Sequence, residues 1–287
     1  MTNLAFNRKL SAGHLEARSD GSTGPQRATQ TRRTGRKNRR SKLEEVPRMA
    51  VASGIAVLGE RVIVWGKDLH DECLDLSFVH YYHYCATGRW FTTKEARIWE
   101  RLWISTGYPD ARLWCNRIAG YLGAARVDPG LCLSAAIAAS NSEDYGFGAL
   151  RNAYRLQLEI PAATEARSAW LGAELERKRR FFGYGRPVKA PDERLLVTYR
   201  ILAEEGMMAG PALKRAYWLG RRLAERKGID LNVAGAWSAL AIDFGMNEGE
   251  FDTFMLLMLI PGYMAVYTDQ RRREPLGFLA GYRAKLR

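Results

Sequence analysis

Two arginines near the middle of the sequence are of a type that binds or stabilises anions. Arg186 directly follows a glycine turn, Gly183-Tyr184-Gly185, and Arg194 comes shortly after it. A guanidinium cannot act as an acid near neutral pH, but it can stabilise a developing oxyanion or hold a carboxylate with two parallel N–H donors. An ion pair on a helix surface is the alternative interpretation for Arg194.

A carboxylate and a phenol could supply the proton chemistry that arginine lacks. Asp230 lies at the start of a predicted helix, where it could act as a general base or simply cap the helix. Tyr145, in Asp144-Tyr145-Gly146, is a competent hydrogen-bond donor but a poor proton shuttle at pH 7. Packing at a helix start is the alternative for Tyr145, and the residues alone leave both alternatives open.

Helical periodicity predicts the elements that must position these side chains. Prolines stand near the starts of several segments, which is typical of helix N-termini, and Thr92 or Thr93 can cap one helix. The predicted helices cover residues 110–125, 130–140, 146–158, 162–182, 192–205, 209–227, 230–243 and 248–269, with a break at Pro261-Gly262 in the last. Residues 55–58 and 61–65 predict a small hairpin, so the fold class is mainly α with an amino-terminal β-hairpin.

The charge is concentrated at the amino terminus. Residues 1–48 hold 12 of the 44 Lys/Arg but only 4 of the 31 Asp/Glu. This composition predicts a disordered basic tail, either a solvated segment, a weak nonspecific contact for phosphates, or sequence upstream of a start at Met49. The mean hydropathy of −0.31 and a longest apolar run of only residues 254–267 predict no membrane association.

The cysteines and histidines predict neither a metal site nor disulfides. Four cysteines contain no Cys-x-x-Cys pair, which favours free thiols in a reducing, cytoplasmic compartment. His80 and His83 have helical i, i+3 spacing but no acidic or thiol partner nearby, so packing is the favoured interpretation.

Several segments together resemble citrate synthases and citryl-CoA lyases. Residues 183–194 resemble the family's histidine loop, with Arg186 in place of the histidine, and residues 229–240 resemble the segment with its catalytic aspartate. Weaker matches lie at Gly66-Lys67-Asp68-Leu69, Leu76-Ser77-Phe78, Thr87-Gly88-Arg89, residues 93–97 and residues 261–265. The resemblance covers roughly residues 55–287.

The resemblance implies a role for each candidate side chain. Asp230 would deprotonate the acyl α-carbon, and Tyr145 would hydrogen-bond the enolate oxygen. Arg186 and Arg117 would bind the 2-oxo acid and its developing alkoxide, and Arg194 would hold a carboxylate.

The resemblance also implies an architecture and an activity. The two-lobed fold would combine residues 50–146 with 245–287 in a large domain and leave 147–244 as a small domain, in a homodimer. The chain would form or cleave a C–C bond between an acyl-CoA and a 2-oxo acid, with a CoA thioester as substrate and no cofactor. The alternative is a noncatalytic relative that binds a CoA thioester or a carboxylate, and whether the chain is an enzyme stays open.

Overall fold

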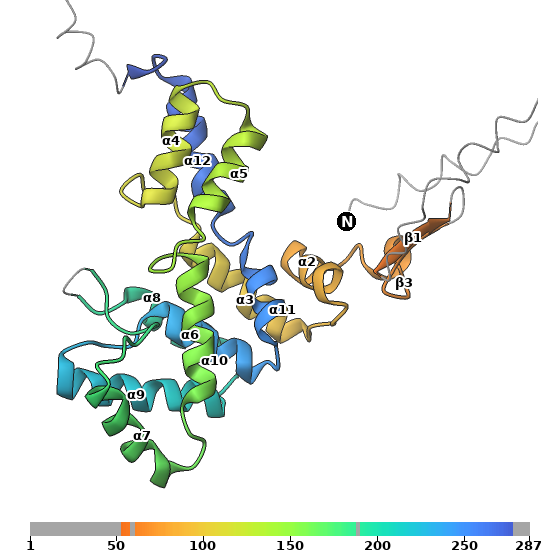
Figure 1. The fold of residues 1–287 in the computed structure, drawn as a ribbon. Helices are drawn as coiled ribbons and strands as arrows, with labels where there is room; N and C mark the ends of the chain where they lie inside the picture. The colour runs from red at the N-terminus through yellow and green to blue at the C-terminus, as the bar shows by residue number, and fades with distance from the viewer. Residues whose placement is uncertain (1–52, 58–60, 188–189, 278–287) are drawn as a thin grey trace, which may run out of the picture. The chain divides into compact units, whose positions relative to one another are not determined.

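The computed structural model describes residues 53–57, 61–187 and 190–277, and these form a mainly helical protein with one small sheet (Figure 1). The predicted fold class is therefore confirmed, while the predicted basic tail, residues 1–48, lies outside the described residues. The helices are α1 (Leu69–Glu72), α2 (Phe78–Thr87), α3 (Thr93–Thr106), α4 (Trp114–Ala124), α5 (Pro129–Ala139), α6 (Phe147–Glu159), α7 (Thr164–Glu176), α8 (Glu193–Glu204), α9 (Pro211–Lys227), α10 (Val233–Asp243), α11 (Glu248–Met255) and α12 (Ile260–Arg272).

The predicted amino-terminal hairpin is present and gains a third strand. Strands β1 (Gly54–Val57) and β2 (Arg61–Val64) pair antiparallel, with Gly54 opposite Val64. A turn at Trp65 and Gly66, both with positive φ, then returns the chain as β3 (Lys67–Asp68) against β2. Positive φ at both central residues suits the twist of a tight hairpin. The sequence missed β3 because two polar residues carry no alternating pattern.

A capping box fixes the start of α3. The Thr92 side chain accepts a hydrogen bond from the Glu95 N–H, and the Glu95 carboxylate accepts one from the Thr92 N–H at 2.7 Å. This reciprocal capping box satisfies two helix donors that otherwise lack partners. Of the two predicted cap residues, Thr92 and Thr93, the structure shows that Thr92 is the cap.

The predicted break in the last helical segment lies earlier than expected. α11 ends at Met255 and α12 begins at Ile260, so Pro261 stands in the first turn of a new helix rather than inside one. Proline is tolerated there because its missing N–H would have no partner in the helix. Across Glu248–Arg272 the helical chain is long and apolar enough to cross a membrane by length and composition alone, but 44% of its most apolar stretch is buried inside the protein. That burial is expected of a core segment.

Two apolar clusters hold the helices together. The larger joins α2, α3 and α6–α11 and includes the fully buried rings of Trp99 and Trp237. The smaller joins α4, α5 and α12, where the hydroxyls of Ser140 and Tyr263 meet at 2.5 Å. The described residues lie in one compact unit, Val51–Arg287. The division into two lobes stays a prediction.

The α2 histidines pack into the aromatic core, as the sequence favoured. The His83 ring stacks on Phe91 with centroids 3.6 Å apart, and His80 meets Trp90 edge-on at 4.8 Å. Burial, together with the charges of Arg89 and His80, lowers the pKa of His83 to about 3. The imidazole of His83 is therefore neutral in the folded protein at physiological pH.

The four cysteines are all free thiols. Burial raises the pKa of Cys132 and of Cys73, which keeps both protonated.

Candidate functional site

The glycine turn is anchored by the tyrosine at its centre. Tyr184 forms a β-bridge with Leu231, just before α10. Its buried hydroxyl accepts a hydrogen bond from the Gln157 amide at 3.1 Å and donates one to the Ala216 carbonyl at 3.2 Å. Burial raises the pKa of the Tyr184 phenol, so it remains a donor at physiological pH. Tyr184 thus ties the turn to α6 and α9.

The two glycines let this turn lie directly on the start of α10. Gly183 and Gly185 both have positive φ, +85° and +79°. A Cβ added at Gly183 would lie 2.6 Å from the Gly235 Cα, which leaves no room for a side chain. The Gly185 N–H donates to the Asp230 carbonyl at 2.7 Å. The backbone therefore places Arg186 next to the segment that carries Asp230.

Asn232, and not Asp230, caps α10. The Asn232 side-chain oxygen accepts hydrogen bonds from the N–H groups of Ala234 and Gly235, and its amide donates to the Gly185 carbonyl at 2.7 Å. The capping alternative for Asp230 is therefore wrong, because the helix begins at Val233 and its cap position is taken. The sequence signal was present, since asparagine is a strong N-cap residue.

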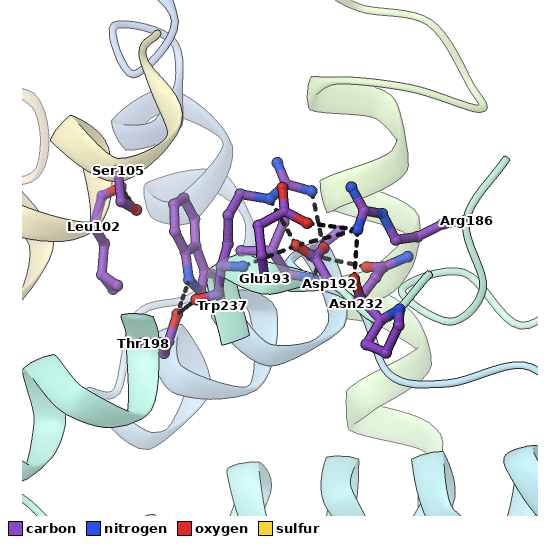
Figure 2. Close-up of polar contacts among 12 residues, drawn as sticks. Leu102, Ser105, Arg186, Asp192, Glu193, Thr198, Asn232 and Trp237 are labelled. Carbon is purple, nitrogen blue, oxygen red and sulfur yellow. Dashed lines mark hydrogen bonds and ion pairs between the residues drawn. The ribbon is translucent and has the colours of Figure 1, made fainter. Parts of the chain in front are cut away.

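A buried carboxylate that the sequence analysis passed over lies at the centre of the polar network. The Asp192 side chain, fully buried, receives the Arg194 guanidinium on both oxygens at 2.8 and 2.9 Å and the Val233 N–H at 2.9 Å (Figure 2). Burial opposes its ionisation, but Arg194, the Val233 N–H and Arg186 together hold the pKa of Asp192 below its usual value. Asp192 also caps α8 by accepting from the Arg194 N–H, so one carboxylate joins α8 to α10.

Arg186 points into the same network (Figure 2). One guanidinium nitrogen donates to the Pro191 carbonyl and to the Glu193 carboxylate, both at 2.8 Å, and lies 4.0 Å from Asp192. The hydrogen bond from Arg186 lowers the pKa of Glu193. Both arginines of the segment are therefore already paired with carboxylates. Arg194 does form an ion pair, but its partner Asp192 is fully buried and does not lie on a helix surface. A substrate role for Arg194 stays a prediction.

A cavity of about 390 Å³ opens where the glycine turn meets the start of α10. Arg186, Asp192 and Asp230 contribute to its wall, and the Asp230 carboxylate forms no hydrogen bond or ion pair within the described residues. The lining residues are Gly185, Arg186, Ala190, Pro191, Asp192, Gly228, Ile229, Asp230 and Leu231. The structure thus places the Asp230 carboxylate and the Arg186 guanidinium in the wall of one cavity.

Three predicted site residues, Arg194, Tyr145 and Arg117, are not among the residues that line this cavity. Tyr145 is half exposed on the loop between α5 and α6. Arg117 is exposed on α4, where its Nε donates to the Ala111 carbonyl at 3.2 Å. The roles of Tyr145 and Arg117 stay predictions, because neither lines the cavity with Arg186 and Asp230.

The architecture is similar to that of solved structures from one group of enzymes. Citryl-CoA lyase from Hydrogenobacter thermophilus superimposes with a TM-score of 0.70 at 23% identity, over 79% of this chain and 89% of that chain. ATP citrate lyase from Methanothrix soehngenii, solved with citrate and coenzyme A, gives 0.70 at 18% identity over 89% of this chain and 44% of that chain. Citrate synthase from Thermoplasma acidophilum, solved with carboxymethyl coenzyme A and oxaloacetate, gives 0.52 at 17% identity over 69% and 54%.

The sequence comparisons are sparser. No family model matches the chain. The citrate synthase-like protein clz17 of Cochliobolus lunatus is 32% identical over 123 residues, which is 42% of this chain and only 29% of that protein. The resemblance inferred from the sequence is confirmed, and the chain has the fold that citrate synthases and citryl-CoA lyases share.

Proposed function

We propose that this chain forms or cleaves a C–C bond between an acyl-CoA and a 2-oxo acid in the cavity beside Arg186. The observation that carries the proposal is that one cavity wall holds the Arg186 guanidinium and the Asp230 carboxylate, which has no hydrogen-bond or ion-pair partner among the described residues. Solved structures of the same fold hold citrate with coenzyme A, or oxaloacetate with a coenzyme A derivative. An acid and a thioester are therefore reasonable ligands for this cavity.

Each side chain has a defined task in the synthetic direction. Asp230 takes the proton from the α-carbon of the thioester, and the electron pair of that C–H bond forms the enolate. The enolate carbon attacks the ketone carbon of the 2-oxo acid, the new C–C bond forms, and the C=O π pair becomes an alkoxide. Arg186 stabilises this alkoxide by donating hydrogen bonds before solvent protonates it. Cleavage follows the same steps in reverse.

The proposal extends to the assembly and the setting of the protein. Tyr145 would hold the enolate oxygen, and Arg117 and Arg194 the acid's carboxylates, in a homodimer. The CoA thioester is a substrate and no cofactor is needed. The free thiols of all four cysteines are consistent with a cytoplasmic protein.

A second candidate, a noncatalytic binder of a CoA thioester or carboxylate, is favoured by one specific observation. Arg186 and Arg194 already bind Glu193 and Asp192, so a ligand anion must compete with carboxylates of the chain itself. A cavity in this state can hold a ligand without the free donors that turnover requires.

One experiment separates the two candidates. The purified chain is incubated with acetyl-CoA, propionyl-CoA and a panel of 2-oxo acids while mass spectrometry follows the condensed acyl-CoA product, and calorimetry measures ligand binding. Asp230→Asn is expected to lower turnover by roughly 10²-fold or more, as for loss of a general base. Asp75→Asn is the matched control, since Asp75 is an exposed aspartate outside the cavity.

The outcomes decide between the candidates directly. Turnover that is lost in Asp230→Asn and kept in Asp75→Asn supports the enzyme. Turnover that survives Asp230→Asn contradicts the assignment of the base. Ligand binding without turnover across the whole panel leaves the noncatalytic binder.

A further inference from the structure

A second, larger cavity adjoins the first along the same segment of chain. Its volume is about 720 Å³, and it shares four lining residues with the smaller cavity, namely Pro191, Asp192, Asp230 and Leu231. Both volumes fall within the range of roughly 300–1,000 Å³ that is usual for small-molecule sites. Asp230 therefore lies on the boundary between two cavities.

The two cavities differ in the chemistry of their walls. The smaller has the guanidinium of Arg186, whereas the larger is walled by side chains of α8 and α9 that are mostly apolar or aromatic. Those residues are Leu195, Tyr199, Tyr217, Gly220 and Ala224, with the exposed Arg221 and Glu225 beside them.

Two stacked tyrosines form the most distinctive part of the larger cavity. The rings of Tyr199 and Tyr217 lie 5.0 Å apart between centroids at an interplanar angle of 24°. Burial raises the pKa of both phenols, so this wall is uncharged at physiological pH. Such a surface suits an apolar chain or ring rather than a second anion.

We propose that the larger cavity holds the acyl group of the CoA thioester, so that the protein selects acyl groups longer than acetyl. This inference rests on the proposed function, because it takes Asp230 as the group that meets the α-carbon. The substituent on that carbon then enters the cavity walled by Tyr199 and Tyr217. The 2-oxo acid lies on the opposite side, beside Arg186.

The test measures how affinity depends on acyl length, with no 2-oxo acid present. Calorimetry on the full chain compares free CoA, acetyl-CoA and octanoyl-CoA. Burying one methylene improves the dissociation constant by about fourfold, so six extra methylenes that are even partly buried are expected to give at least a tenfold advantage. Equal affinities for acetyl-CoA and octanoyl-CoA would overturn the proposal.

Filling the cavity provides the second arm. Ala224→Trp is expected to reduce the octanoyl advantage to less than threefold while the affinity for acetyl-CoA stays unchanged, and Ala224→Leu, a smaller change, is expected to reduce it partially. Ala203→Trp, on an exposed position of α8 outside both cavities, is the matched control and is expected to keep the full advantage. An octanoyl advantage that persists in both Ala224 variants would refute the assignment of this cavity.

These measurements test the acyl site independently of the proposed C–C chemistry. A chain-length preference that disappears in the Ala224 variants, found with no turnover, supports the acyl site and contradicts the C–C chemistry. Turnover of acetyl-CoA with no chain-length preference supports the chemistry and contradicts the acyl site.

Discussion

Replacing Asp192 by asparagine tests whether this carboxylate holds the candidate site together. The substitution keeps the size of the side chain but removes its charge. Asp192 is fully buried and receives four hydrogen bonds, two from the Arg194 guanidinium, one from the Arg194 N–H and one from the Val233 N–H. An amide cannot satisfy all of these donors, and its own NH₂ group would face the guanidinium.

The expected loss in free energy of unfolding follows from these four hydrogen bonds to a buried charge. Removing one partner of a buried ion pair typically costs about 3–5 kcal/mol, because the remaining charge stays buried without compensation. Arg194 retains some solvent access, with 22% of its side chain exposed, so we expect the lower half of that range, about 3–4 kcal/mol. For a domain of this size the loss corresponds to a fall in Tm of roughly 6–16 °C.

The chain contains its own control for this experiment. Asp110 and Arg112 repeat the same arrangement, with the N–H and the guanidinium of the arginine donating to an aspartate two residues earlier. In that pair the arginine side chain is 89% exposed, so water replaces most of what Asp110→Asn removes. Urea unfolding followed by tryptophan fluorescence gives the free energy of unfolding of both variants. If Asp192→Asn loses no more stability than Asp110→Asn, the reasoning from burial is refuted.

Two further predictions concern the core and the glycine turn. Burial lowers the pKa of His83 to about 3, whereas an unfolded histidine titrates near 6.5. The contribution of neutral His83 to the free energy of unfolding is therefore fully present above pH 6.5. It is lost as the pH falls from there towards 3, by about 1.4 kcal/mol per pH unit. Urea unfolding at several pH values is expected to show a shallower loss in His83→Phe and an unchanged one in the exposed control His70→Gln; equal slopes in wild type and His83→Phe would contradict this. Gly183→Ala is expected to lower the free energy of unfolding by about 2–5 kcal/mol. The left-handed backbone would be strained with alanine, and the new Cβ would lie only 2.6 Å from the Gly235 Cα. Gly228→Ala, also at positive φ but with open space around it, is expected to cost only about 1–2 kcal/mol, and equal losses in thermal unfolding would show that crowding does not matter.

Local signals in the sequence were sufficient to predict most of the helices. Thr92, Pro129 and Pro211 each mark the start of a helix, and the helix that each one marks begins within a residue or two of it. The position of the last break was predicted less well. It was expected at Pro261-Gly262, but α11 already ends at Met255 and α12 begins at Ile260.

The candidate site was predictable only in part, because some of its contacts join residues far apart in the sequence. The glycine turn and Asp230 were found because both follow a recognisable pattern, and the structure places them in one cavity. The importance of Asp192 was missed because its hydrogen bond to the Val233 N–H joins residues 41 apart in sequence. Nor could the pairing of Arg186 with Glu193 be inferred from the sequence, since the two residues share no helix whose spacing would bring them together.

The glycine turn is fastened to the protein without the side chain of Arg186. Its attachments are the buried Tyr184, the close backbone approach of Gly183 to α10 and the hydrogen bond from the Asn232 amide to the Gly185 carbonyl. The residues that hold the turn in place are therefore different from Arg186, the residue that would contact a substrate. A substitution at position 186 can therefore alter the activity while the turn keeps its shape.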